Sequence, residues 1–184
     1  PIKGLAYSEE LELVVSTSFD YTAVIWDAGT MQELKQLIGH DAAVNAAAFS
    51  PDGRWLATAG DDNQVLLWET AELRDSRHTP TGIPLTGHTA KIVHLAFSGD
   101  SKYLASSSWD RRVGLWDVGT LSIKQFLTSH KGPVNAAQFS KDGKLLYSGG
   151  ADGHIRVWRL ETGEFVRSIV RNGFGINVMQ LSPK

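Results

Sequence analysis

The sequence predicts an all-β protein in which one small antiparallel sheet recurs along the chain. Four of the six tryptophans are spaced at nearly constant intervals: Trp26, Trp68, Trp116 and Trp158 lie 42, 48 and 42 residues apart. Short apolar runs, bounded by clusters of turn-forming residues, fill each interval, a pattern typical of strands. Because one such sheet cannot bury both of its faces alone, the repeats must pack against one another.

The second repeat contains the predicted elements in their clearest form. Strands are predicted at Val44–Phe49, Trp55–Thr58 and Val65–Trp68, each of which is a short and mostly apolar run. The segment Ser50–Gly53, with proline second and glycine last, suits a tight turn between the first two strands, and Gly60–Asn63 provides the next turn. A fourth strand is predicted after the tryptophan of the other repeats, at residues 32–37, 123–127 and 165–170.

The repeat register divides the chain into four units of four strands and a remainder. The units span residues 1–42, 43–90, 91–132 and 133–174, and residues 175–184 resemble the first strand of a fifth unit. The longer interval contains six additional residues, which lie within Thr70–Thr86. This stretch is polar and contains proline, so we expect it to form a surface loop.

Composition excludes several classes of protein. The chain has 184 residues and a formal net charge of −2, so its bulk charge does not favour nucleic-acid binding. No apolar run is long enough to span a membrane. The absence of cysteine excludes disulfides and thiolate metal ligands, and it is consistent with the cytoplasm or another reducing compartment. No glycine-rich phosphate-binding loop is present, and we expect no cofactor.

Three further residue types keep the register of the tryptophans. An aspartate lies six residues before each of the four, a serine or threonine lies four before that aspartate, and a histidine lies 22 before it in three repeats. The complete sets are His40, Thr58, Asp62 and Trp68; His88, Ser106, Asp110 and Trp116; and His130, Ser148, Asp152 and Trp158. The first repeat supplies Ser16, Asp20 and Trp26.

Together these features resemble the WD-repeat family of β-propellers, and the resemblance covers essentially the whole chain. It is carried by the Trp-Asp pairs at 26–27 and 116–117, the Gly-His pairs at 39–40 and 87–88, and the stretches at 49–69 and 139–159. Departures are Glu69 and Arg159 after the other two tryptophans and Ser129 before the third histidine. The resemblance implies four-stranded blades, and in each blade a buried, hydrogen-bonded tetrad of histidine, hydroxyl, aspartate and tryptophan.

Four blades of this type would leave a propeller ring open, with sheet edges and blade faces uncovered. We therefore expect the chain to be part of a larger propeller of about seven or eight blades, or a half that closes with a second copy of itself. A compact ring of four blades is the remaining alternative.

The recurrence of serine, histidine and aspartate has to be compared with a catalytic triad. Nucleophilic catalysis needs one activated hydroxyl beside an oxyanion-binding site. Here the set occurs three times, always with a tryptophan, and one hydroxyl belongs to threonine, so we interpret it as a structural brace. His78, His94 and His154 lie outside these sets and lack metal-ligand spacing, so neither an enzyme nor a metal site is predicted.

The remaining function is binding, and we predict a protein-interaction scaffold. The resemblance implies that partners meet the narrow face formed by the start of each innermost strand and by the turn before each tetrad aspartate. The residues at the turn positions are Phe19, Asp61, Trp109 and Ala151. The residues at the strand positions are Pro1, Lys3, Ala43, Asn45, Lys91, Val93, Pro133 and Asn135.

Trp109 is the most informative of these candidates. A tryptophan at a turn tip is costly to expose and is typical of interface hot spots. Arg111 and Arg112 follow on the same turn, so the group could take a peptide with an acidic or aromatic side chain. The alternative for Trp109 is packing against a loop of a neighbouring blade. For the whole chain, the alternatives are a purely structural set of blades and, more weakly, recognition of nucleic acid or phosphate.

Overall fold

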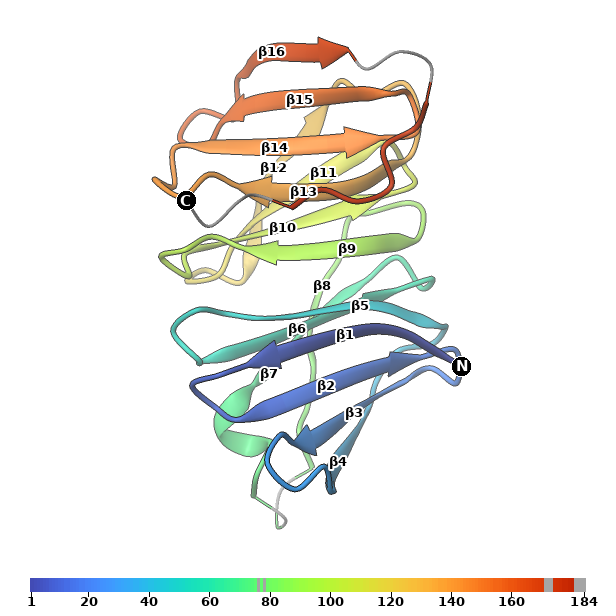
Figure 1. The fold of residues 1–184 in the computed structure, drawn as a ribbon, viewed down its shortest axis with the longest axis vertical. Helices are drawn as coiled ribbons and strands as arrows, with labels where there is room; N and C mark the ends of the chain where they lie inside the picture. Colours follow the sequence, from blue (N-terminus) through green and yellow to red (C-terminus); the bar gives the residue numbers. More distant parts are fainter. Residues whose placement is uncertain (76, 78, 171–173, 181–184) are drawn as a thin grey trace.

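The computed structural model describes residues 1–75, 77, 79–170 and 174–180. Within them, four antiparallel sheets of four strands each follow one another along the chain, and we call them blades 1 to 4 (Figure 1). In every blade the strands pair in sequence order, and the first strands of adjacent blades contact each other, which makes them the innermost. The all-β meander predicted for each repeat is therefore confirmed.

Within the four units, the strands that the sequence indicates agree with the structure to within two residues at each end. Blade 1 contains β1 (Ile2–Ser8), β2 (Leu13–Ser18), β3 (Thr22–Asp27) and β4 (Glu33–Ile38). Blade 2 contains β5 (Val44–Phe49), β6 (Trp55–Gly60), β7 (Val65–Glu69) and β8 (Ile83–Leu85). Blade 3 contains β9 (Ile92–Phe97), β10 (Tyr103–Ser108), β11 (Arg112–Asp117) and β12 (Ser122–Thr128). Blade 4 contains β13 (Val134–Phe139), β14 (Leu145–Gly150), β15 (His154–Arg159) and β16 (Phe165–Val170).

The predicted turn at Ser50–Gly53 joins β5 to β6. The amide of Gly53 donates to the carbonyl of Ser50 at 2.9 Å, and Gly53 has a φ of 67°, a region that favours glycine. The Asp52 carboxylate accepts bonds from the Ser50 hydroxyl at 2.6 Å and from the Arg54 amide at 3.1 Å. Blade 4 repeats this turn at residues 140–143, so the same turn chemistry reverses the chain in both blades.

Adjacent blades are joined by apolar clusters, one at each of the three seams between them. Side chains alternate along a strand, so Leu56 faces blade 1 whereas Ala57, the next residue, faces blade 3. Each cluster combines residues of two neighbouring blades, for example Ile25 with Leu56, Leu67 with Leu104, and Leu115 with Leu146. Stacking therefore buries the faces that a single four-stranded sheet would leave exposed.

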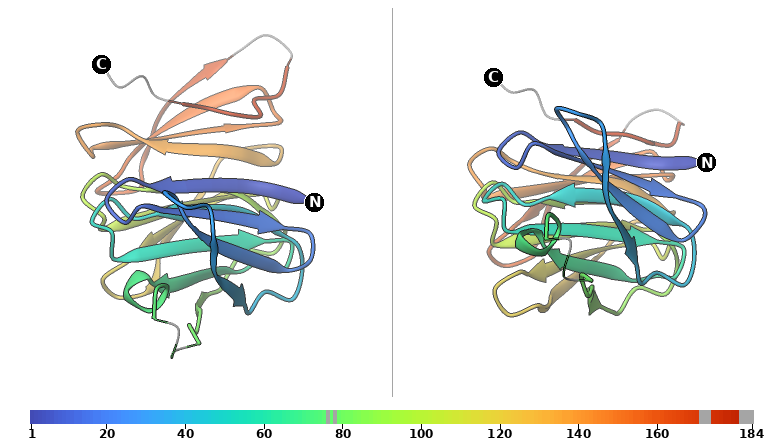
Figure 2. Two further views of the ribbon diagram at one scale, coloured as in Figure 1. Left: turned by 60° about the horizontal axis from the view of Figure 1, so that its bottom comes forward. Right: turned by 90° about the horizontal axis from the view of Figure 1, so that it is seen from below.

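The four blades do not close into a ring (Figures 1 and 2). Blade 1 keeps one face uncovered, and the outer face of blade 4 is covered only in part, by the segment 174–180. On β1 of blade 1, Leu5 and Tyr7 are 66% and 59% exposed. On β16 of blade 4, Ile169 is 46% exposed. These exposed apolar side chains are consistent with blades that belong to a larger propeller.

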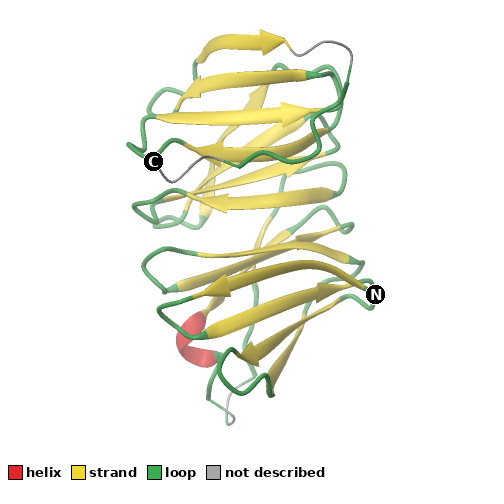
Figure 3. Ribbon diagram, viewed as in Figure 1, coloured by secondary structure: helices red, strands yellow, loops and turns green. Residues whose placement is uncertain are grey.

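The insertion at Thr70–Thr86 lies along the outside of the seam between blades 1 and 2. It begins with a short 3-10 turn, η1 (Thr70–Glu72), drawn as the helix in Figure 3, and it contains β8, which pairs with β7. The ammonium of Lys35 in blade 1 donates to the carbonyl of Glu72 at 3.0 Å. The stretch is thus tied to its neighbour rather than being a free loop, although its residue His78 lies outside the described residues. No helix in the described part of the chain is long and apolar enough to cross a membrane.

The extra strand expected over residues 175–184 is not formed in the part that the structure describes. Residues 174–180 make no ladder, because no described strand lies beside them as a second strand. Asn135 nevertheless donates to the carbonyl of Ile176 at 2.9 Å, as Asn45 of blade 2 donates to the carbonyl of Ile92 on β9 at 3.0 Å. The segment therefore occupies the place of the next innermost strand, and residues 181–184 lie outside the described residues.

Candidate partner-binding face

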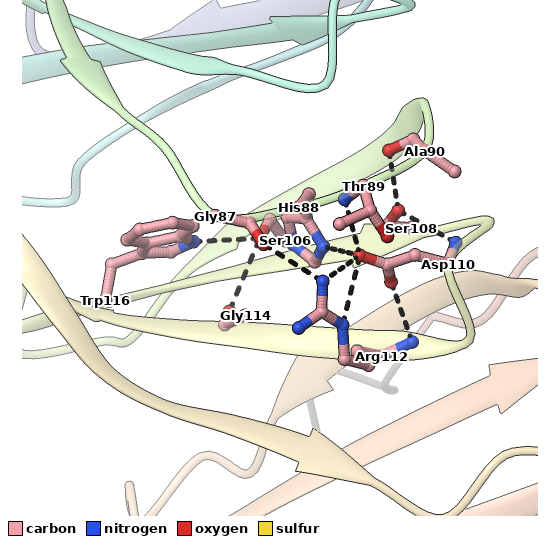
Figure 4. Close-up of polar contacts among 10 residues, drawn as sticks. All are labelled: Gly87, His88, Thr89, Ala90, Ser106, Ser108, Asp110, Arg112, Gly114 and Trp116. Atoms are coloured by element: carbon pink, nitrogen blue, oxygen red, sulfur yellow. Dashed lines mark hydrogen bonds and ion pairs between the residues drawn. The ribbon is translucent and has the colours of Figure 1, made fainter.

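A hydrogen-bonded tetrad braces blade 3. His88 joins Asp110 to Ser106 through its two ring nitrogens: Nδ1 lies 2.7 Å from Asp110 Oδ2, and Nε2 lies 2.7 Å from Ser106 Oγ (Figure 4). The indole of Trp116 donates to the same hydroxyl at 2.8 Å. Because Ser106 is fully buried, the tetrad gives partners to polar groups that would otherwise be buried without any. The hydroxyl is enclosed and serves as a brace.

Blades 2 and 4 contain the same arrangement, and blade 1 contains part of it. His40 lies 2.6 Å from Asp62 and 2.8 Å from Thr58, which accepts a bond from Trp68 at 2.9 Å. His130 lies 3.0 Å from Asp152 and 2.8 Å from Ser148, which accepts a bond from Trp158 at 2.8 Å. In blade 1, Trp26 bonds Ser16 at 2.8 Å, whereas Asp20 is exposed and accepts a bond from the Thr22 hydroxyl at 2.6 Å.

The tetrad aspartates are held as anions. Burial alone would raise the pKa of Asp110, but hydrogen bonds from His88 and Arg112 outweigh it and hold that pKa well below its usual range. Burial likewise opposes ionisation of Asp152, but bonds from the Lys131 amide and from His130 lower its pKa to about 2. A permanent carboxylate fixes the orientation of each histidine ring and of the loop that carries it.

Blade 4 adds a buried arginine to its tetrad. Arg156 is 5% exposed, and it donates from Nη1 to Asp152 Oδ2 at 2.8 Å and from Nε to Ser129 Oγ at 3.2 Å. Ser129 stands where glycine precedes the other two tetrad histidines, so this departure from the repeat pattern supplies an acceptor for Arg156. Burial lowers the pKa of His130, and the Arg156 charge lowers it further, against the opposing effect of Asp152.

From the sequence we expected Arg112 to project from the turn beside Trp109, but in the structure it does not. Its guanidinium folds back onto Asp110, to which Nη2 donates at 2.8 Å, and Nη2 also donates to the carbonyl of Gly87 at 2.9 Å (Figure 4). The guanidinium also lies over the ring of Phe126 on β12, 4.2 Å from its centroid, so Arg112 is held by blade 3 and by the loop that precedes β9. Arg112 therefore extends the brace, whereas Arg111 is exposed.

The predicted face positions come together in every blade through one backbone bond. The residue before each tetrad aspartate donates its amide to a carbonyl at or just before the start of the innermost strand: Phe19 to Pro1 at 3.2 Å, Asp61 to Ala43 at 2.8 Å, Trp109 to Lys91 at 3.0 Å, and Ala151 to Pro133 at 2.8 Å. All four turn residues are exposed. The turns and strand starts thus form one edge of the four blades, which we call the narrow face.

Two turns of the narrow face carry an aromatic ring with a lysine over it. Lys91 Nζ lies 3.6 Å from the ring centroid of Trp109, and Lys3 Nζ lies 4.1 Å from that of Phe19. Both aromatic residues remain 47% exposed. Sequence reasoning placed these four residues on one face but did not pair them, since the lysine and the ring are distant in sequence. Trp109 contacts a lysine of its own blade and leaves nearly half of its surface to solvent.

Asn45 and Asn135 connect their blades to the next segment of the chain rather than only facing solvent. Asn45 donates to Asp61 Oδ1 at 2.7 Å in addition to its bond with the next blade. Val93 has the same register in blade 3, and with Lys3 and Asn45 it lines a shallow groove of about 260 Å³ between β1, β5 and β9. The candidate residues therefore divide into ones that hold the blades together and ones that face outward.

The histidines outside the tetrads have different surroundings. His94 lies opposite Ser107 across β9 and β10, and its Nδ1 and the Ser107 hydroxyl are buried without a hydrogen-bond partner among the described residues. His154 lies on β15, where its Nδ1 is 2.9 Å from Ser168 Oγ. The described part of the chain contains no group of three or more side chains placed to hold a metal ion.

Three segments of the chain match the family model described as WD domain, G-beta repeat: residues 31–69, 79–117 and 121–159. They cover more than half of the chain, and each of them runs from the outermost strand of one blade through the first three strands of the next and contains one complete tetrad. The chain therefore belongs to the WD-repeat family. The matched segments leave out most of blade 1, where the tetrad lacks its histidine.

Within this family the chain is similar to several proteins over a short stretch. It is 36% identical over 72 residues, 39% of the chain, to Periodic tryptophan protein 2 of Arabidopsis thaliana. It is 45% identical over 58 residues, 31% of the chain, to Notchless protein homolog of Arabidopsis thaliana. It is 39% identical over 59 residues, 32% of the chain, to Ribosome assembly protein 4 of Saccharomyces cerevisiae. These matches span only 8%, 12% and 12% of the three relatives.

Proposed function

We propose that this chain belongs to a non-enzymatic scaffold that binds a protein or peptide through the narrow face of its blades. The observation that carries the proposal is Trp109, which is 47% exposed at the tip of a turn and lies under the Lys91 ammonium. A large ring that is already positioned supplies contact area at a low entropic cost on binding. The family, and a relative named for ribosome assembly, support a role in protein complexes.

The tetrad of blade 3 holds both segments that flank this ring. Asp110 directly follows Trp109 and binds His88, and it also accepts the amide of Thr89 at 3.1 Å. One carboxylate therefore connects the turn that carries Trp109 to the loop that carries Lys91. Since the two segments do not have to be ordered when a partner arrives, more of the contact energy is expressed as affinity.

A structural role is the second candidate, and the incompletely covered end blades favour it. Leu5 and Tyr7 expose apolar surface on blade 1, and residues 174–180 lie where a further innermost strand would pack. Such blades would complete a larger propeller or pair with a second copy. The two roles are compatible, because closure of the ring covers blade faces and leaves the narrow face accessible. The lack of cysteine supports a cytoplasmic setting, and the net charge of −2 disfavours nucleic acid as the partner.

Replacement of Trp109 tests the binding role directly. We expect Trp109→Ala to weaken partner binding by at least about 2 kcal/mol while the melting temperature stays unchanged, because the ring is largely outside the core. Affinity capture with the wild-type chain and the variant, followed by calorimetry on the captured partner, measures the loss. Trp109→Phe keeps an aromatic ring under Lys91 and should retain most of the affinity. A fall in melting temperature that matches the loss of binding would indicate packing instead.

A further inference from the structure

The exposed charge on the narrow face is positive over blades 3 and 4. The loops that carry the tetrad residues of these blades place Arg111 and Lys131 in solvent and Lys91 partly so. The same loops contain Asp110 and Asp152, whose side chains are only 3% and 9% exposed. Each of these carboxylates is paired with an arginine of its own blade. The described loops of blades 3 and 4 therefore present three cations and no accessible carboxylate. The exposed carboxylate of Asp61 on blade 2 lies at the adjoining seam, where Asn45 donates both to it and to the carbonyl of Ile92.

Blades 1 and 2 present a different charge on the same face. Their corresponding loops expose the carboxylates of Asp20, Asp41 and Asp61, and Lys3 is an exposed cation there. The Lys3–Phe19 contact resembles the Lys91–Trp109 contact, with an equally exposed ring, but it lies beside Asp20. Phe19 thus provides an internal comparison: a similar lysine–ring pair in surroundings of opposite charge.

Resting on the proposed function, we infer that Trp109 and the exposed cations of blades 3 and 4 form a subsite for an acidic peptide segment. An apolar or aromatic side chain of the segment covers the exposed part of the Trp109 ring. Aspartate or glutamate side chains on either side of it pair with Lys91, Arg111 and Lys131. The Arg111 guanidinium matches a carboxylate in a two-bond geometry, and Lys91 is already held against the ring.

The same charges favour a short peptide over a nucleic acid. Affinity for a nucleic-acid backbone grows with the number of phosphates that are neutralised, and this half of the face offers three cations. A continuous polyanion would also extend over the carboxylates of blades 1 and 2, where like charges repel it. A short acidic segment can end on blades 3 and 4 and avoid that repulsion.

Binding of synthetic peptides to the chain of residues 1–184 tests this inference. The probes are an array of short fluorescent peptides in which Trp, Phe or Leu is flanked by Asp and Glu at varied spacing, and their isosteres with Asn and Gln. Fluorescence anisotropy should show the acidic peptides binding about tenfold or more tightly than their isosteres, with the difference reduced at high salt. Lys91→Gln, Arg111→Gln and Lys131→Gln should each weaken the acidic peptides several-fold, whereas Lys3→Gln and Phe19→Ala, the matched controls, should not.

The outcomes separate this inference from the proposed function. If isosteres bind as tightly as acidic peptides and Trp109→Ala weakens both, the binding role of Trp109 holds and the acidic class is wrong. If acidic peptides bind but Trp109→Ala has no effect, the subsite is wrong and the role of Trp109 loses its support. If no peptide of the array binds, the acidic class is overturned, while affinity capture still tests Trp109. Tighter binding of polyuridylate RNA that is lost in Trp109→Ala would overturn the inference in favour of nucleic acid.

Discussion

A single position on the inner strand of blade 3 differs from its counterparts in the other blades. The register places Gly4, Ala46 and Ala136 where blade 3 has His94. A Cβ at Gly4 would lie 2.8 Å from the carbonyl oxygen of Asn45 in the next blade, so this position faces the following seam. The strands β5, β9, β10 and β13 contain no Asp, Glu, Lys or Arg, and their one other titratable side chain is Tyr103 on β10. The lysine of β1, Lys3, lines the same groove as His94, and its positive charge also disfavours protonation of the ring. Burial lowers the pKa of His94 from its ordinary value of 6.5.

The stability of the chain should therefore fall on mild acidification through His94. Because the folded state disfavours the protonated ring, the contribution of His94 is fully present above its unfolded pKa and is lost as pH falls toward the lower folded pKa. His94→Ala introduces alanine, the residue that blades 2 and 4 have at this position. We expect this variant to lose less stability than the wild type between about pH 7 and about pH 5. Thermal unfolding over a pH series measures the difference. A pH dependence of stability in His94→Ala that equals that of the wild type would contradict the prediction.

The tetrad hydroxyl can be tested by two substitutions at one site. Thr58→Ala would leave His40 Nε2 and Trp68 Nε1 buried without their shared partner, so we expect a loss of at least about 2 kcal/mol in the free energy of unfolding. Thr58→Ser keeps the hydroxyl and reproduces blades 3 and 4, and it should cost clearly less. Urea titration followed by tryptophan fluorescence measures both. Equal losses for the two variants would assign the effect to the threonine methyl group rather than to the tetrad.

At the scale of elements, the sequence predicts what local chemistry determines. The runs at Val44–Phe49 and Phe165–Val170 become β5 and β16 with the predicted bounds. At β5, turn residues on either side stop the strand. It does not indicate β8 at Ile83–Leu85, since a three-residue strand in a proline-containing insertion shows no alternation. The segment at 174–180 has the composition of a strand but lacks a second strand to pair with among the described residues.

The candidate site could be predicted as a set of positions but not as a set of contacts. Repeat register alone places Trp109 and Lys91 at the same edge of blade 3. It does not show that Lys91 lies over the ring or that Arg112 turns back onto Asp110, because both depend on side-chain directions at a tight turn. The sequence likewise does not predict that His94 Nδ1 is buried without a hydrogen-bond partner. A histidine at a register position where two other blades have alanine is a signal that could have identified this residue.

At the scale of the whole molecule, the uncovered face of blade 1 and the partly covered face of blade 4 should make the chain of residues 1–184 associate. Exposed apolar side chains such as Leu5 and Tyr7 lose their contact with water when another blade covers them. We expect the mass measured by light scattering to rise with concentration, and Leu5→Glu to reduce this rise without lowering the melting temperature. A chain that stays monomeric at every concentration would contradict the expectation and would favour a self-sufficient set of four blades.

The three apolar clusters make the molecule a one-dimensional array in which every blade is coupled only to its immediate neighbours. Removal of an end blade then breaks one coupling, whereas disruption of blade 2 or 3 breaks two. Local opening should accordingly begin at the ends and advance inward. Trp109 belongs to one of the two blades shielded on both sides, so the surface it presents persists through fraying that has already released blade 1 or the segment after blade 4.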